Sequence, residues 1–140
     1  MNSRAALYTV MDRYLAALAM RDVAAAGLAD DAFITENNVR LAAGDGLWHT
    51  ATALHPYQLR MAEPEAGQVA VFTAVEETDA LNPACIRLEV AAGRITGVET
   101  VVARNKDEGF PFGPQFFEPK PEMDLPPGPA TRAELRHIAD

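Results

Sequence analysis

The chain has 140 residues, of which 49 % are hydrophobic, and a formal net charge of −8. This length and composition suit one compact domain and exclude wholesale disorder. Nucleic acids and anionic membranes attract basic surfaces, so an acidic chain disfavours both as partners. We expect the partner to be a small molecule, neutral or apolar.

A single cysteine, Cys85, excludes an intramolecular disulfide and a cysteine-based metal site. The three histidines show no metal-binding spacing, so we expect no metal, and no cofactor motif is present. The first residues do not have the pattern of a signal peptide, and no apolar run reaches membrane-spanning length. A cytoplasmic protein is the default expectation.

The N-terminal pattern predicts a helix over Ser3–Met20, with Ser3 as its N-cap. Its apolar residues recur at helical spacing: Leu7, Val10, Met11, Tyr14, Leu15 and Leu18. Asp22 is expected to cap a short helix that runs to Leu28. A short strand over Ala32–Thr35 follows, and the polar residues Glu36, Asn37 and Asn38 come directly after it.

The middle of the chain is predicted to be mainly β-structure. Val39–Trp48 reads as a hairpin or a loop with one strand, and His49–Leu54 as a helical turn that Pro56 ends. Alternating apolar and polar residues then predict four strands: Tyr57–Ala62, Gln68–Glu77, Ala84–Val90 and Arg94–Arg104. The turn-like segments EPEAG, TDALNP and AAG separate them.

The composition changes after the last predicted strand. Residues 105–130 are rich in proline, glycine and phenylalanine, which predicts an ordered arm over the domain or over a partner subunit; disorder is the alternative. The last ten residues, 131–140, resemble residues 3–12, and Thr131 with Glu134 predicts a capping box. Either this is an ordinary helix, or the chain is one repeat of a tandem protein. We therefore expect a main domain over 1–104, an arm and a terminal helix.

Residues 13–37, RYLAALAMRDVAAAGLADDAFITEN, resemble the start of the SnoaL-like and ketosteroid-isomerase branch of the NTF2-like superfamily. The pattern ENN-V-R-L…G-G-L-W, from Glu36 to Trp48, is similar to a group of NTF2-like proteins. The resemblance implies an α+β cone, in which N-terminal helices pack on a strongly curved antiparallel sheet. It also implies a homodimer formed through the open face of the sheet.

The same resemblance implies a reaction centre. Tyr14 matches the family's oxyanion-binding tyrosine, and Glu36 matches the general base at the end of a strand. The family's third residue, a protonated acid, is expected near Ile86, but neither Cys85 nor Ile86 is acidic. Steroid isomerisation itself is therefore not the expected reaction.

Two further residues are candidate catalytic groups by their chemistry. The Asn37 amide can hold a substrate oxygen or orient the base, although asparagine is equally suited to a turn. His49 can act as an acid or base partner, and a solvent-facing position beside a helix start is its alternative.

Four residues are candidate substrate contacts. Trp48 and Phe72 are expected to line an apolar pocket, and Tyr57 its opening. Arg40 can bind a substrate carboxylate with its guanidinium; a surface acid is the alternative partner, as it is for Arg104.

The predicted activity is proton abstraction and anion stabilisation without a cofactor, on a small apolar or aromatic substrate. An isomerase, a dehydratase or a carbon–carbon lyase all use this chemistry. One alternative is a module that binds a small ligand or dimerises without catalysis. Another is a hydrolase in which Glu36 activates water for attack on an epoxide, which would require a second acid close by.

Overall fold

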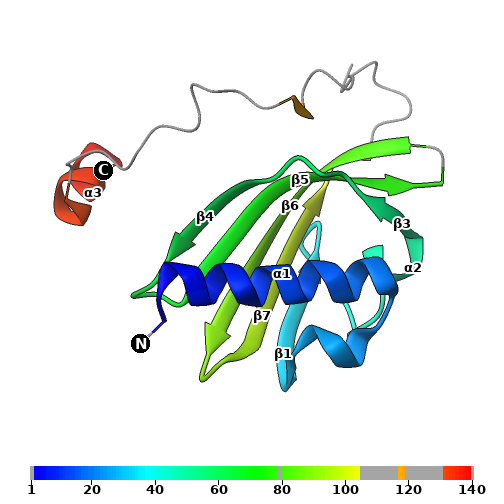
Figure 1. Ribbon diagram of the computed structural model, residues 1–140, viewed down its shortest axis with the longest axis horizontal. Helices are drawn as coiled ribbons and strands as arrows, with labels where there is room; N and C mark the ends of the chain where they lie inside the picture. Colours follow the sequence, from blue (N-terminus) through cyan, green and yellow to red (C-terminus); the bar gives the residue numbers. More distant parts are fainter. Residues whose placement is uncertain (1, 79, 105–116, 119–130, 140) are drawn as a thin grey trace.

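The computed structural model describes residues 2–78, 80–104, 117–118 and 131–139. One long helix, α1, lies across one face of a curved sheet, and a shorter 3₁₀ helix, η1, follows it (Figure 1). The helices are α1 (Arg4–Met20), η1 (Val23–Ala26), α2 (Leu47–Thr50) and α3 (Arg132–Ala139). The strands are β1 (Leu28–Glu36), β2 (Val39–Arg40), β3 (Ala51–Leu54), β4 (Leu59–Glu63), β5 (Gln68–Glu77), β6 (Ala80–Ala91) and β7 (Arg94–Val102).

Local signals fix both ends of α1. The Ser3 hydroxyl accepts the N–H of Ala6 at 3.1 Å, which confirms the predicted N-cap. At the other end Arg21 adopts a left-handed conformation, with a φ of 55°, and its N–H bonds back to the last turn.

Within the described residues, no helix combines the length and the apolar character needed to cross a bilayer.

The strands form one mixed sheet in the order β2-β1-β7-β6-β5-β3, with β4 also paired to β5. All pairs are antiparallel except β1 with β7, which run parallel. This parallel pair places the carboxyl ends of β1 and β7 side by side. Residues that follow these two strands, far apart in sequence, are therefore neighbours in space.

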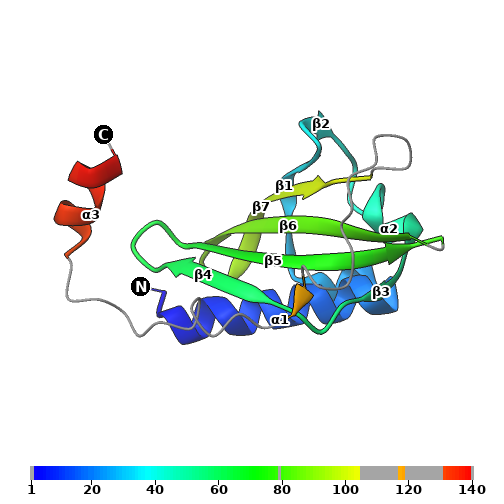
Figure 2. The same ribbon diagram turned by 90° about the horizontal axis from the view of Figure 1, so that it is seen from above.

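The two faces of the sheet differ in what covers them. Alternate residues of β5 and β6, such as Val71 and Ile86, are fully buried beneath α1. The intervening residue Phe72 of β5 points to the opposite face, as does Val101 of β7, and both are about half exposed. In Figures 1 and 2 no described helix covers that second face, which we call the open face.

The structure corrects several predicted boundaries. The segment predicted as one helical turn, His49–Leu54, is divided: a single turn, α2, ends at Thr50, and an edge strand, β3, begins at Ala51. That prediction was wrong because β3 is stabilised by pairing with β5, a contact that local sequence does not encode. The first strand is also longer than predicted.

The predicted turn TDALNP is mostly strand. β6 begins at Ala80 and includes Pro83, which pairs with Ala74 of β5. Proline cannot donate to the ladder, but its carbonyl still accepts the N–H of Ala103 at 3.0 Å. Its position near the start of the strand explains why the sheet accommodates it.

The terminal helix forms where it was predicted. Thr131 and Glu134 make reciprocal contacts: the Thr131 N–H donates to the Glu134 carboxylate at 2.7 Å, and the Glu134 N–H donates to the Thr131 hydroxyl at 3.3 Å. These bonds confirm the capping box. Most of the predicted arm, 105–130, lies outside the described residues, and the relation of 131–140 to a second repeat stays a prediction.

Candidate functional site

Glu36, the predicted general base, is the last residue of β1 and lies beside the carboxyl end of β7. Its side chain is 12 % exposed. One carboxylate oxygen, Oε2, accepts the backbone N–H of Leu47 at 2.9 Å, and the other, Oε1, accepts Arg104 Nη2 at 2.7 Å. The carboxylate is thus held in one orientation by the start of α2 and by a guanidinium.

A glycine makes this close approach feasible. Gly46 has a φ of 64°, and a Cβ built on it would lie 2.3 Å from Glu36 Oε2. Only glycine combines that backbone conformation with the space that the carboxylate occupies. The G-D-G turn in the sequence therefore places α2 against the end of β1.

Arg104 joins Glu36 to a second carboxylate, Glu77. Arg104 Nε donates to Glu77 Oε2 at 2.7 Å, and Nη2 donates to Glu77 Oε1 at 2.9 Å. Glu77 also accepts hydrogen bonds from the Thr50 hydroxyl and, at 2.9 Å, from the Asn82 amide. One guanidinium therefore bridges two carboxylates that extend from strands β1 and β5.

The Glu77 carboxyl is strongly stabilised in its charged form. Its side chain is 7 % exposed. Burial on its own would raise the pKa of Glu77, but the hydrogen bonds from Arg104, Thr50 and Asn82, together with the positive charge of Arg104, lower the pKa below its ordinary value. Hydrogen bonding to Glu77 likewise raises the pKa of Arg104, which stays charged.

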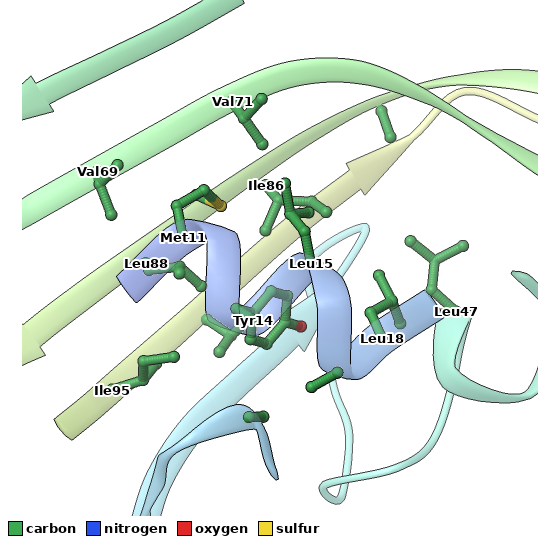
Figure 3. Close-up of a cluster of buried hydrophobic side chains, with 14 of the residues drawn as sticks. Met11, Tyr14, Leu15, Leu18, Leu47, Val69, Val71, Ile86, Leu88 and Ile95 are labelled. Atoms are coloured by element: carbon green, nitrogen blue, oxygen red, sulfur yellow. The ribbon is translucent and has the colours of Figure 1, made fainter. Parts of the chain in front are cut away.

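Tyr14, the predicted hydrogen-bond donor, is buried in the core beneath the sheet, and its oxygen points toward the side where Leu18 and Leu47 lie (Figure 3). Its ring packs edge-on against Trp48, with centroids 5.6 Å apart. Burial raises the pKa of Tyr14 well above its ordinary value, and the negative charge of Glu36 raises it further, while the Trp48 side chain acts in the opposite direction. The phenol is therefore protonated near neutral pH.

The structure packs Tyr14 against Trp48 and places Glu36 within electrostatic range of the phenol, whereas Asn37 and His49 make other contacts. The Asn37 side chain bonds to both backbone groups of Val102, accepting the N–H at 2.8 Å and donating to the carbonyl at 3.1 Å. With a φ of 48°, Asn37 serves as a turn residue. His49 is 75 % exposed and lies 3.6 Å from Asp45, in the solvent-facing position that was its alternative.

The remaining candidate substrate contacts lie away from Glu36. The Arg40 guanidinium stacks over the Phe33 ring at 4.8 Å. Tyr57 and Phe72 line a groove of about 520 Å³ on the open face, so Phe72 does not share a pocket with the buried Trp48. Phe117 also lines this groove, with its ring 6.1 Å from that of Tyr57.

Sequence reasoning did not identify Glu77 as part of the site, although a signal was present. Val69, Val71, Thr73, Val75 and Glu77 alternate along β5, and all of them are buried. Period-two alternation therefore places Glu77 on the inner face of the sheet, where a carboxylate requires partners. The alternative for Arg104 was pairing with surface acids; the structure pairs it with two acids, but both are largely buried.

This arrangement combines three chemical capabilities. Glu36 supplies a carboxylate whose two described hydrogen bonds leave part of its accepting capacity for a proton, because a carboxylate has about four lone-pair positions. Tyr14 supplies a neutral hydroxyl donor. Arg104 supplies a permanent positive charge, and its side chain is 39 % exposed.

No protein family model matches the chain, and no curated protein matches it. Several solved structures are similar. A "putative ketosteroid isomerase" from Kribbella flavida is 17 % identical with a TM-score of 0.60, covering 93 % of this chain and 95 % of that one. A "putative polyketide cyclase" from Xanthomonas campestris is 18 % identical with a TM-score of 0.58, covering 70 % and 90 %.

An NTF2-like protein of unknown function from Cytophaga hutchinsonii is 12 % identical with a TM-score of 0.54, covering 69 % of this chain and 89 % of that one. Identities this low establish a shared fold and do not transfer a reaction. The neighbours agree with the helix on a curved, unclosed sheet seen in Figure 1. The chain therefore has the NTF2-like α+β fold that the sequence predicted.

Proposed function

We propose that the protein is a cofactor-independent enzyme that abstracts a proton from a small apolar or aromatic substrate and stabilises the resulting anion. The observation that carries the proposal is the Glu36 carboxylate. It is largely buried, fixed at both oxygens, and close enough to the Tyr14 phenol for its charge to raise the pKa of that phenol. A fixed base beside a neutral donor is the minimum that this chemistry requires.

In the proposed mechanism Glu36 takes a proton from a carbon atom of the substrate, using a lone pair that neither Leu47 nor Arg104 occupies. The electron pair moves onto a substrate oxygen, and the Tyr14 hydroxyl donates a hydrogen bond to it. A phenol with a raised pKa remains protonated and so stabilises the anion without losing its own proton. Isomerisation, dehydration and carbon–carbon cleavage can all begin with this step.

A generic proton-abstraction probe tests the base without knowledge of the natural substrate. In 5-nitrobenzisoxazole a base removes the ring C–H proton, the N–O bond breaks, and a coloured phenolate forms. We expect the wild-type chain to catalyse this reaction and Glu36→Gln to reduce the rate by about 10²-fold or more. Asp31→Asn is the matched control, because it removes an exposed carboxylate from the same strand.

Circular dichroism should show that both variants keep the wild-type fold. Equal rates for wild-type and Glu36→Gln, with the fold intact, would remove Glu36 from the mechanism. An equal loss in Asp31→Asn would show that net charge, and not the position of Glu36, controls the rate.

A water-activating hydrolase is a second candidate, because a second acidic residue lies close to Glu36. Glu77 shares Arg104 with Glu36, since Arg104 Nη2 donates to both carboxylates. In this alternative Glu36 takes a proton from water while the water oxygen attacks an epoxide carbon. The C–O bond opens, and the alkoxide that forms takes a proton from a second water molecule to give the diol. Styrene oxide separates the two candidates: formation of the diol supports the hydrolase, and turnover of the benzisoxazole alone supports proton abstraction from carbon.

A binding or dimerisation module is the candidate from a different class, and the open face supports it. Four large apolar side chains are exposed on or near this face: Phe33, Met61, Phe72 and Val101. Two of them, Phe72 and Val101, line the apolar groove. We propose that a second copy covers this face in a homodimer. Light scattering should give twice the chain mass, and Phe72→Asp should give a monomer. A wild-type chain that remains monomeric at high concentration would contradict the dimer.

A further inference from the structure

The Glu36–Arg104–Glu77 cluster is asymmetric, and the asymmetry affects the candidate base. Arg104 binds Glu77 through two nitrogens, Nε and Nη2, but reaches Glu36 through Nη2 alone. Glu77 is also the more buried of the two carboxylates and has two further donors, Thr50 and Asn82. Two-point guanidinium–carboxylate contacts are the stronger type. Arg104 is therefore held mainly by Glu77.

This sharing changes the electrostatic field at Glu36. A lone arginine beside a carboxylate stabilises the charged form and weakens the carboxylate as a base. Here part of the positive charge of Arg104 is offset by the negative charge of Glu77, which the same guanidinium binds.

The other described groups around Glu36 do not offset the charge of Arg104. From α1 the Tyr14 phenol is neutral, and from the start of α2 the Leu47 N–H contributes a dipole. His49, also on α2, is exposed and pairs with Asp45. Among the described residues that contact Glu36 directly, Arg104 is the charged one, and Glu77 is the group that balances it.

We propose that Glu77 is a positioning residue for the reaction at Glu36: it anchors Arg104 in a shared contact and offsets its charge, which keeps Glu36 basic enough to accept a proton. The inference rests on the proposed function, because it concerns the same base. Its physical core, the dependence of Glu36 protonation on Glu77, can be measured without any substrate.

The test is a carbon-13 NMR titration of the full chain labelled at glutamate side-chain carboxyls, with the Glu36 signal assigned by its loss in Glu36→Gln. In Glu77→Gln the whole charge of Arg104 acts on Glu36. We expect Glu36 to titrate about one pH unit lower than in the wild type. Glu76→Gln is the matched control, since it removes an exposed carboxylate from the adjacent position of β5 and should leave the titration unchanged.

Two more variants separate charge from packing. Glu77→Asp keeps the negative charge while disturbing the packing, and should leave Glu36 near its wild-type titration. Glu77→Met removes the charge with a side chain of similar length, and serves if the glutamine amide prevents folding. An unchanged Glu36 titration in the uncharged variants, or an equal shift in Glu77→Asp, would overturn the proposal.

The kinetic arm distinguishes this inference from the proposed function. With 5-nitrobenzisoxazole the acidic limb of the pH–rate profile should move in Glu77→Gln by the same amount as the NMR titration. If Glu77 had a purely structural role, Glu77→Gln would lower the free energy of unfolding and leave the acidic limb of the pH–rate profile unchanged. An NMR shift without any wild-type turnover would contradict the proposed enzyme but support the dependence of Glu36 protonation on Glu77. Turnover without an NMR shift would support the enzyme and overturn the inference.

Discussion

At the scale of single residues, the position of Glu36 depends on the atom that Gly46 lacks. The glycine allows the α2 backbone to approach until the Leu47 N–H meets the carboxylate. Asn37, the next residue after Glu36, then turns the chain and bonds to Val102. The candidate base is thus fixed by backbone contacts on one side and by Arg104 on the other.

Gly46→Ala should be more destabilising than an ordinary glycine substitution. The positive φ alone costs a non-glycine residue about 1–3 kcal/mol, and the new Cβ also collides with Glu36. Gly93→Ala is the control, because Gly93 has a φ of 76° but no atom within 4 Å of the new Cβ. Urea denaturation measures both variants. Equal losses of unfolding free energy would show that the contact with Glu36 is not a constraint.

The Tyr14→Phe variant tests the role of the buried Tyr14 hydroxyl. Removal of this group should cost about 1 kcal/mol of unfolding free energy and reduce benzisoxazole turnover by about 10²-fold, because the product anion loses a donor. Tyr8→Phe is the control, since the Tyr8 hydroxyl contacts the Arg60 carbonyl at 3.5 Å, away from Glu36. A normal rate in a folded Tyr14→Phe protein would assign Tyr14 to the core alone.

At the scale of elements, sequence patterns succeeded where the signal was local. The helix α1, its cap at Ser3 and the capping box at Thr131 were all predicted, because each depends on residues within one or two turns. α2 and β3 were misassigned, because a one-turn helix and an edge strand have little intrinsic preference. Their structure is set by Glu36 and by β5.

The cap of α1 gives a prediction at this scale. Ser3→Ala removes the acceptor for the Ala6 N–H and should lower the free energy of unfolding by about 1 kcal/mol. Thr9→Ala changes a hydroxyl on the exposed side of the same helix, where it bonds the Ala5 carbonyl, and should alter stability by less than about 0.5 kcal/mol. A larger loss in Thr9→Ala would contradict the capping argument.

At the scale of the whole molecule, the Arg104 cluster joins strands that are not neighbours in the sheet. Glu36 ends β1 and Glu77 ends β5, with β7 and β6 between them. A charge network across this distance stabilises the fold only while its carboxylates are ionised. The stability of the molecule should therefore depend on pH.

The pKa of Glu77 is lowered in the folded state, so its contribution to stability is complete above the pKa of an unfolded glutamate and is lost as the pH falls through the lower, folded value. We expect the free energy of unfolding to decrease below about pH 4. Chemical denaturation at several pH values should show a shallower dependence in Glu77→Gln than in the wild type. Glu76→Gln should keep the wild-type slope, and equal slopes in all three proteins would exclude this role.

The sequence by itself determined the helix, most strands and the position of Glu36 at a strand end, because hydrophobic periodicity and capping act over short distances. Its resemblance to NTF2-like proteins implied the α+β fold. The sequence also predicted that Tyr14 faces the interior. Only the tertiary structure decided that Arg104 and Glu77 meet Glu36, that His49 faces solvent, and that Phe72 lies on the other side of the sheet from Trp48. These relations depend on strand order and on the parallel pairing of β1 with β7, which join segments that are distant in the chain.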